Sequence, residues 1–181
     1  MSKNFLLAFF LYLFGSQSAF STTITYEVQD LADTTAGEDL WQYAYNISNH
    51  NFTADTGFSI YFDVSLYSNL QDPAHFVNAD WDILTLQPDL LLPDDGIYDA
   101  YALVDNASIT DSFTVNFVWL GLNTPTSQSF ELYDNSFAVI ETGVTQPTNT
   151  TPIPEPHGIF LVGLGMMVLL RLHRQKTKTF C

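Results

Sequence analysis

The sequence predicts an all-β domain, a β-sandwich of about eight strands, and three observations lead to this fold class. Residues 41–48, 58–64 and 112–119 alternate apolar with polar side chains, which is the period of a half-buried strand. Turn-forming residues separate the candidate strands, as in Asn-His-Asn at 49–51 and Pro-Asp-Asp-Gly at 93–96. No helical period occurs between residues 22 and 142. A jelly-roll and an immunoglobulin-like topology both fit this pattern.

Each expected strand has its own apolar stripe. In chain order they are residues 24–28, 41–48, 58–64, 81–86, 97–104, 112–119, 129–133 and 136–141. The alternation is clearest where aromatic rings repeat, as in Trp41, Tyr43 and Tyr45. The single cysteine, Cys181, ends the chain, so we expect a domain over residues 22–142 without disulfides, held by its aromatic core.

Residues 1–21 have the parts of a secretory signal peptide. Lys3 supplies the positive start, residues 5–14 are apolar, and Ala19 and Ser21 are the small residues that signal peptidase requires. We expect cleavage after Ser21, with a cut after Ala19 as the second choice. An uncleaved anchor fits less well, because a membrane-spanning helix needs about 20 apolar residues.

The charges divide the chain in the same way. Residues 22–156 hold all twenty Asp and Glu residues and no Lys or Arg, a formal charge of −20. The basic residues lie at the two ends, which places both ends in the cytoplasm and the acidic body on the other side of the membrane. A body without Lys or Arg lacks the groups that bind phosphates, so we expect no nucleic-acid partner.

The C-terminal region reads as a linker followed by a tail. Residues 143–152 are rich in Thr and Pro, a composition typical of an extended linker. The tail, residues 153–178, starts with Pro154, Glu155 and Pro156, where the prolines prevent a helix. An apolar run at 158–170 follows and is expected to form a helix. At thirteen residues this helix would be ~20 Å long, short for a hydrocarbon core of ~30 Å.

This tail resembles the PEP-CTERM sorting signal of Gram-negative envelope proteins. Pro154, Glu155 and Pro156 match its motif, and Arg171 and Arg174 match its basic end. The chain departs from the pattern at His157, where Ser or Thr is more usual, and in the extra residues 175–181. The resemblance covers the tail alone.

The resemblance implies how the protein is processed and where it goes. The tail helix would hold the chain in the inner membrane transiently, until an exosortase cuts near the motif. The body would then reach the outer envelope or the exopolysaccharide matrix. The alternative is a permanent membrane anchor.

The body offers few groups for catalysis. It has no Lys, Arg or Cys, its histidines are His50 and His75 in polar turns, and no Gly-x-Ser-x-Gly motif occurs. We therefore expect a non-enzymatic envelope or matrix protein without a required cofactor, in contact with exopolysaccharide as its candidate partner.

Two alternatives stay open. The first is a carbohydrate-binding module, with Trp81 between Asp80 and Asp82 as the candidate platform for a sugar ring. It could depend on calcium, since carboxylates near the turn at 93–96 offer hard oxygen ligands. These candidate ligands are Asp89, Asp94, Asp95 and Asp99. The second is a secreted glycosidase that uses a pair of the same carboxylates or the pair Asp80 and Asp82.

We predict that the exported protein begins at Thr22 and lacks residues 159–181. N-terminal sequencing and intact-mass measurement check both ends. A strain without exosortase is the control and should keep the C-terminal residues. An exported protein that starts at Met1, or that keeps Cys181 beside an active exosortase, would contradict the prediction.

Overall fold

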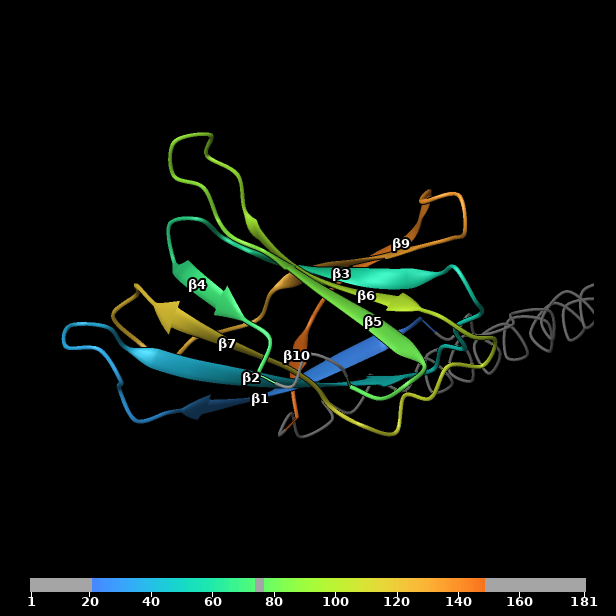
Figure 1. Cartoon of the computed structure of the whole chain (residues 1–181), viewed down its shortest axis with the longest axis horizontal. Coiled ribbons are helices and arrows are strands. Elements are labelled where there is room, and N and C mark those ends of the chain that lie inside the picture. Colours follow the sequence, from blue (N-terminus) through green and yellow to red (C-terminus); the bar gives the residue numbers. More distant parts are fainter. Residues whose placement is uncertain (1–20, 74–76, 149–181) are drawn as a thin grey trace, which may run out of the picture. The chain divides into compact units, whose positions relative to one another are not determined.

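The computed structural model describes residues 21–73 and 77–148, and this part of the chain is all-β, as predicted. Ten strands form two five-stranded sheets that lie as two layers in Figure 1. The described residues contain no helix, and so none that is long and apolar enough to cross a membrane. Ala19 of the predicted leader and the whole sorting tail, including Pro154, Glu155, Pro156, Arg171 and Arg174, lie outside the described residues.

Each sheet is named after the strand in it that comes first in the sequence. The β1 sheet has the order β10 (Gln146–Pro147), β1 (Thr23–Asp30), β2 (Leu40–Ser48), β7 (Phe113–Trp119) and β4 (Tyr67–Gln71). The β3 sheet has the order β5 (Trp81–Leu86), β6 (Gly96–Ala102), β3 (Gly57–Phe62), β8 (Ser129–Tyr133) and β9 (Val139–Val144). All pairings are antiparallel except that of β10 with β1.

The eight expected strands are all present, with shifted ends, and two further strands are not predicted by alternation. β4 has a register irregularity between Ser68 and Gln71, and Asn69 has a φ of 52°, so its pattern departs from period two. β10 has two residues, too few to show a period.

The predicted linker at 143–152 is partly wrong. β9 runs to Val144, and Gln146 and Pro147 pair with β1. Thr148 then donates its N–H to the Tyr26 carbonyl oxygen at 3.0 Å. The proline is tolerated because β10 is an edge strand, where a missing N–H costs least. The folded unit therefore ends at Thr148, six residues beyond the expected end at 142.

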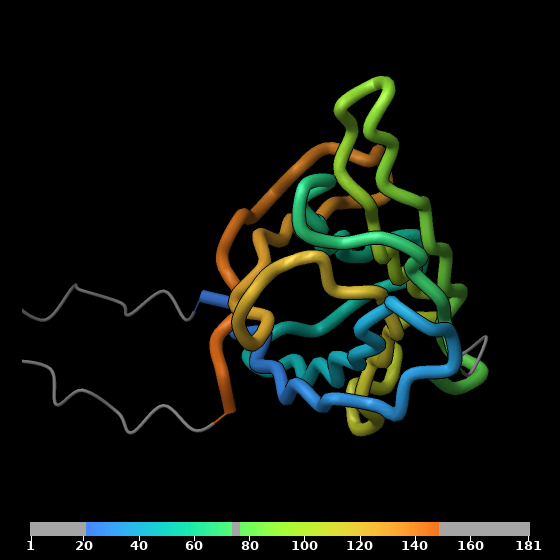
Figure 2. Tube along the Cα trace, turned by 90° about the vertical axis from the view of Figure 1, so that its left-hand side faces the viewer, coloured from blue at the N-terminus to red at the C-terminus, as the bar shows by residue number. Residues whose placement is uncertain are grey.

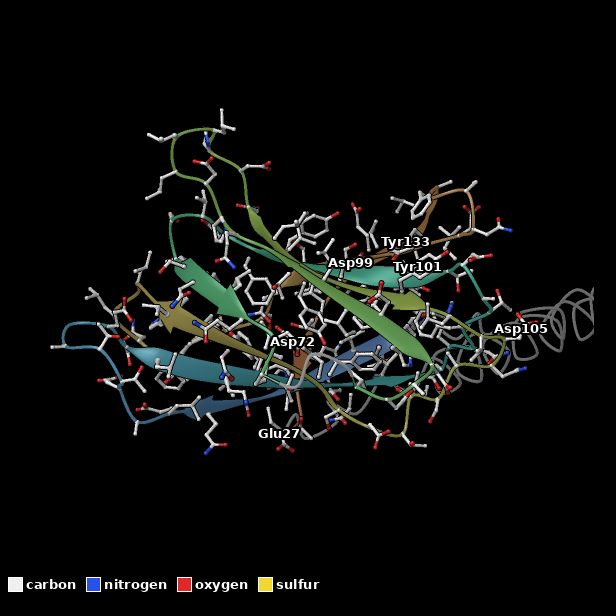
Figure 3. The ribbon with its side chains drawn as sticks, viewed as in Figure 1. Glu27, Asp72, Asp99, Tyr101, Asp105 and Tyr133 are labelled. Atoms are coloured by element: carbon white, nitrogen blue, oxygen red, sulfur yellow. The ribbon has the colours of Figure 1, made fainter. Side chains whose placement is uncertain are left out.

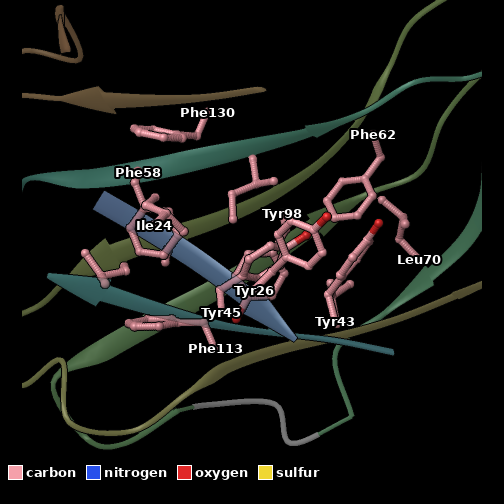
Figure 4. Packing of buried hydrophobic residues seen from close by; sticks show 14 of the residues in the cluster. Ile24, Tyr26, Tyr43, Tyr45, Phe58, Phe62, Leu70, Tyr98, Phe113 and Phe130 are labelled. Atoms are coloured by element: carbon pink, nitrogen blue, oxygen red, sulfur yellow. The ribbon is translucent and has the colours of Figure 1, made fainter. Parts of the chain in front are cut away.

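Aromatic rings from both sheets fill one core (Figure 4). Tyr43 of the β1 sheet packs on Phe117 with ring centroids 4.8 Å apart and on Phe62 of the β3 sheet at 6.3 Å. Phe58 of the β3 sheet meets Phe113 of the β1 sheet edge to face at 5.1 Å. Each such pair adds roughly 0.5–1.5 kcal/mol of stability beyond the contribution of the apolar area that it buries. These contacts stabilise a domain that has no disulfides.

Gln128 connects the tyrosine hydroxyls of this core. Its side-chain nitrogen donates to the hydroxyls of Tyr43 at 2.6 Å and Tyr67 at 3.0 Å, and also to the Thr126 carbonyl oxygen. Its side-chain oxygen accepts from the hydroxyl of Tyr45 at 3.0 Å. Gln128 is 4% exposed, so water cannot take over these bonds. Burial raises the pKa of Tyr45 and of Tyr43, which keeps both hydroxyls neutral.

We predict that Gln128→Leu lowers the free energy of unfolding by about 3 kcal/mol, because it leaves the buried Tyr45 hydroxyl without its partner and removes one hydrogen bond each from the Tyr43 and Tyr67 hydroxyls. The control is Gln42→Leu, which removes a 2.8 Å hydrogen bond to Asn116 on the outer face of the β1 sheet and should cost less than ~1 kcal/mol. Urea unfolding of the chain from Thr22 to Cys181, followed by tryptophan fluorescence, measures both. Equal losses in the two variants would contradict a special role for Gln128.

Candidate functional site

A hollow of about 240 Å³ lies on the outer face of the β3 sheet, the face turned away from the core. Its walls come from four neighbouring strands, β6, β3, β8 and β9, and from the turn between β8 and β9. The lining residues are Ser59, Tyr61, Asp99, Glu131, Tyr133, Phe137 and Val139. Figure 3 shows Asp99 and Tyr133, with the neighbouring Tyr101, on one side of this sheet.

The strand register assembles the floor of the hollow. Ser59 of β3 is opposite Asp99 of β6 on one side and Glu131 of β8 on the other. Residues opposite each other on neighbouring strands point to the same face, so these three form one polar row. The two carboxylate-bearing strands are separated by β3, so their backbones lie ~10 Å apart.

The next row of the register contains Tyr101, Gly57 and Tyr133. A Cβ atom at position 57 would clash with the Tyr133 ring and with the Ala100 carbonyl oxygen. The missing side chain of Gly57 thus lets the Tyr133 ring lie across β3. In that position the Tyr133 hydroxyl donates to an Asp99 carboxylate oxygen at 3.1 Å.

The polar groups of the hollow are paired with one another. The Ser59 hydroxyl donates to the other Asp99 oxygen at 2.7 Å, and the Tyr61 hydroxyl donates to Glu131 at 2.9 Å. Burial raises the pKa of the Asp99 carboxyl, although the bonds from Ser59 and Tyr133 oppose the rise. Burial and the Glu131 carboxylate raise the pKa of Tyr61 to about 12. The hollow therefore offers neutral hydroxyls beside partly desolvated carboxylates.

An aromatic rim borders these groups. The Phe137 ring is 71% exposed and nearly parallel to two others, with centroids 5.6 Å from Tyr133 and 6.3 Å from Tyr101. Its φ of 60° is left-handed, which is unusual for a bulky residue. Asp134 fixes the turn, since its carboxylate accepts from the backbone N–H groups of Ser136 at 2.9 Å and Ala138 at 3.0 Å. The protein thus holds an exposed ring beside the hollow at a cost in backbone strain.

Trp81 is not the sugar platform that the sequence suggested. It is 2% exposed and packs edge to face on Phe52 and Phe113, each at 5.0 Å between centroids. Its indole N–H donates to the Ser108 carbonyl oxygen at 2.8 Å. The flanking carboxylates suggested exposure, but Trp81 occupies an inward position at the start of β5.

The predicted calcium ligands are not brought together. Asp89 and Asp94 exchange two backbone hydrogen bonds that close their turn, and a carboxylate oxygen of Asp95 accepts from the Val64 N–H at 3.0 Å. Asp99 lies in the hollow, on the outer face of β6. Within residues 21–73 and 77–148, no group of three or more His, Cys, Asp or Glu residues could hold a metal ion.

Sequence reasoning identified Asp99 but missed the rest of the hollow. The other members are Ser59, Tyr61, Glu131, Tyr133, Phe137 and Val139. Alternation does place Ser59 and Tyr61 on the outer face of their strand, yet strand order decides which outer residues meet. The signal available in the sequence was Asp134-Asn135-Ser136, a turn-forming run that precedes the exposed Phe137.

Comparison with known proteins adds no assignment: neither a protein-family model nor a curated protein matches the chain. The features that bear on function are therefore the hollow on the β3 sheet and the signals in the sequence.

We predict that Asp99→Asn raises the free energy of unfolding at pH 7. A raised pKa means that the native state holds the Asp99 proton more tightly than the unfolded chain does. Stability is therefore lost as the pH rises from the ordinary value of 3.8 through the native pKa. Asparagine cannot ionise; its amide oxygen can accept from one of the hydroxyls of Ser59 and Tyr133, and its amide nitrogen can donate to the oxygen of the other.

Asp134→Asn is the control with the opposite sign. Hydrogen bonds from Ser136 lower the pKa of Asp134, so its contribution is present above pH 3.8 and is lost as the pH falls through the native pKa. Urea unfolding at intervals from pH 3 to pH 8 measures both variants. A wild-type pH profile in Asp99→Asn would show that this carboxyl is not desolvated.

Proposed function

We propose that this chain is an exported, non-enzymatic β-sandwich protein that binds a neutral polysaccharide in the hollow of the β3 sheet. The observation that carries the proposal is the combination of an exposed, fixed Phe137 ring with the hydroxyls and carboxylates beside it. An aromatic ring covers the C–H face of a sugar, and the polar groups bind its hydroxyls. Binding pockets generally combine apolar walls with a few placed polar groups in this way.

The charge of the body supports a neutral ligand. Residues 22–156 contain no Lys or Arg, and no basic side chain lines the hollow to pair with the carboxylate of a uronic acid or with a sulfate. Asp99 and Glu131 in the hollow would repel such groups. A neutral sugar hydroxyl, in contrast, can donate to either carboxylate.

The sandwich assignment rests on the two sheets and their shared core. Such a domain offers a sheet face to a polymer that runs past it, and the hollow lies on that outer face.

The sequence signals add the cellular setting. A signal peptide cut by signal peptidase and a PEP-CTERM tail cut by an exosortase would deliver the domain to the outer envelope or the exopolysaccharide matrix. Binding to a neutral matrix polysaccharide would then retain it there. Calcium is not part of this proposal, because the candidate ligands do not form a group of three or more within the described residues.

A secreted glycosidase is the second candidate, and one observation favours it. Asp99 has a raised pKa and shares the hollow with Glu131, which is the arrangement of an acid and a base or nucleophile in glycoside hydrolysis. The strand spacing of ~10 Å and the pairing of both carboxylates with tyrosine hydroxyls favour binding over catalysis.

We predict that Phe137→Ala weakens polysaccharide binding at least about tenfold, a loss of ~1.4 kcal/mol. Titration calorimetry with neutral gluco- and galacto-oligosaccharides, and with a uronic-acid polymer as the negative ligand, measures binding by the chain from Thr22 to Cys181. Leu122→Ala is the matched control, since Leu122 is fully exposed and does not line the hollow.

Equal affinity of wild type and Phe137→Ala, or preference for the acidic polymer, would contradict binding in the hollow. If the wild-type chain releases new reducing ends from a polysaccharide and Asp99→Asn does not, the protein is a secreted glycosidase and the binding proposal is wrong.

A further inference from the structure

Glu141 holds the start of the folded chain. The backbone nitrogen of Thr22 donates to one Glu141 carboxylate oxygen at 2.8 Å, and the Thr22 hydroxyl donates to the other at 2.7 Å. The Ser21 hydroxyl donates to the first oxygen, also at 2.7 Å. Thr22 is 5% exposed and directly precedes β1, whereas Glu141 belongs to β9 of the other sheet. These bonds therefore join the two sheets.

The residues that the structure describes contain no Lys or Arg that could pair with this carboxylate. Burial favours a higher pKa for Glu141, but the hydrogen bonds from Thr22 and Ser21 outweigh it and lower the pKa below its ordinary value of 4.5. Among residues 21–73 and 77–148, the other titratable group in contact with Thr22 is His50, whose ring nitrogen lies 3.1 Å from the Thr22 hydroxyl oxygen. Burial lowers the pKa of His50, and its ring packs on Phe52 at 4.3 Å, so it is neutral at pH 7.

The sequence offers no Lys or Arg for this role between residues 22 and 156. One cation can still arise there. Hydrolysis of the Ser21–Thr22 peptide bond consumes one water, leaves a carboxylate on Ser21 and gives Thr22 a free amino group, which takes up a proton at neutral pH. Its nitrogen is the atom that already lies against Glu141.

We propose that removal of the signal peptide after Ser21 converts the Thr22–Glu141 hydrogen bond into an ion pair that fastens the β1 sheet to the β3 sheet. The mature N-terminus is then a structural cation of an otherwise acidic domain. The proposal rests on the export part of the proposed function and is independent of sugar binding. It also distinguishes the two cleavage sites, since a cut after Ala19 would place the charge two residues away from this nitrogen.

The ion pair should work within a defined pH window. A carboxylate partner raises the pKa of the Thr22 amino group above the ordinary ~7.7. Its contribution is therefore complete below that pH and is lost as the pH rises through the native value. Glu141 has a lowered pKa, so its contribution is present above 4.5 and is lost as the pH falls through the native value. Stabilisation is thus largest between these limits.

The test compares two forms of the chain from Thr22 to Cys181, one with a free α-amino group and one Nα-acetylated. Acetylation keeps an N–H donor on the same nitrogen and removes its charge, so it imitates the uncleaved peptide bond. Each form is made with Glu141 and with Glu141→Gln, which keeps an acceptor oxygen. The readouts are the melting temperature from pH 4 to pH 10 and the rate at which an amine reagent labels Thr22.

We expect the free amino group to raise the melting temperature over the acetylated form between about pH 5 and pH 8, and only when Glu141 is present. At pH 7.5 the amine should react roughly sevenfold more slowly with Glu141 than in Glu141→Gln, which is the drop in its unprotonated fraction for a pKa raised by about one. If Glu141→Gln fails to fold, the ion pair is still tested by comparing the melting temperatures of the free and acetylated wild-type chains and by titrating the Thr22 amine.

Equal melting of the free and acetylated wild-type forms, with an ordinary amine pKa, would overturn the ion pair. An exported protein that begins at a residue other than Thr22 would overturn its formation by processing. Oligosaccharide titration of the same samples keeps the two proposals apart, because loss of sugar binding with an intact ion pair would overturn only the proposed function.

Discussion

The domain depends on one constraint, which is that the tyrosine hydroxyls buried in its core must form hydrogen bonds inside the protein. The inward positions of β2 and β4 bring Tyr43, Tyr45 and Tyr67 into the core, and each ring carries an oxygen that water cannot reach. Gln128 bonds to all three hydroxyls and directly precedes β8. The network thus fixes where β8 begins in the β3 sheet, and the outer residues of β8, Glu131 and Tyr133, form part of the hollow. The hydrogen bonds of Gln128 therefore support both the core and the candidate site.

The sequence predicts the strands well because period two is imposed by burial. Where Phe113, Val115 and Phe117 alternate with polar residues, the inward face is the core. The same logic places Trp81 inside, whereas its neighbours Asp80 and Asp82 favour exposure to solvent, and burial is what the structure shows. β4 and β10 are missed for physical reasons: an irregular register removes the period in one, and the other is too short to have one.

The candidate site is harder to predict because it depends on which strands are neighbours. Asp99 and Glu131 are 32 positions apart in the sequence and meet only because β6 and β8 both pair with β3. No local pattern encodes that order. The candidate calcium ligands are the converse case: Asp94, Asp95 and Asp99 are close in sequence, but each makes hydrogen bonds to a different part of the domain. Proximity in sequence is a weak guide to convergence in a sheet protein.

The parallel pairing of β10 with β1 has a mechanical consequence. The described chain starts at Ser21 and ends at Thr148 on one side of the folded unit, as Figure 2 shows. If the protein is held through the residues that follow Thr148, a pull reaches β10 first. That strand has two residues at a sheet edge, assisted by two hydrogen bonds from Thr148 to the Tyr26 carbonyl oxygen. It would peel away before the longer β9 feels tension, so the first response to stretching is a few residues of slack, with the core and the hollow unstrained.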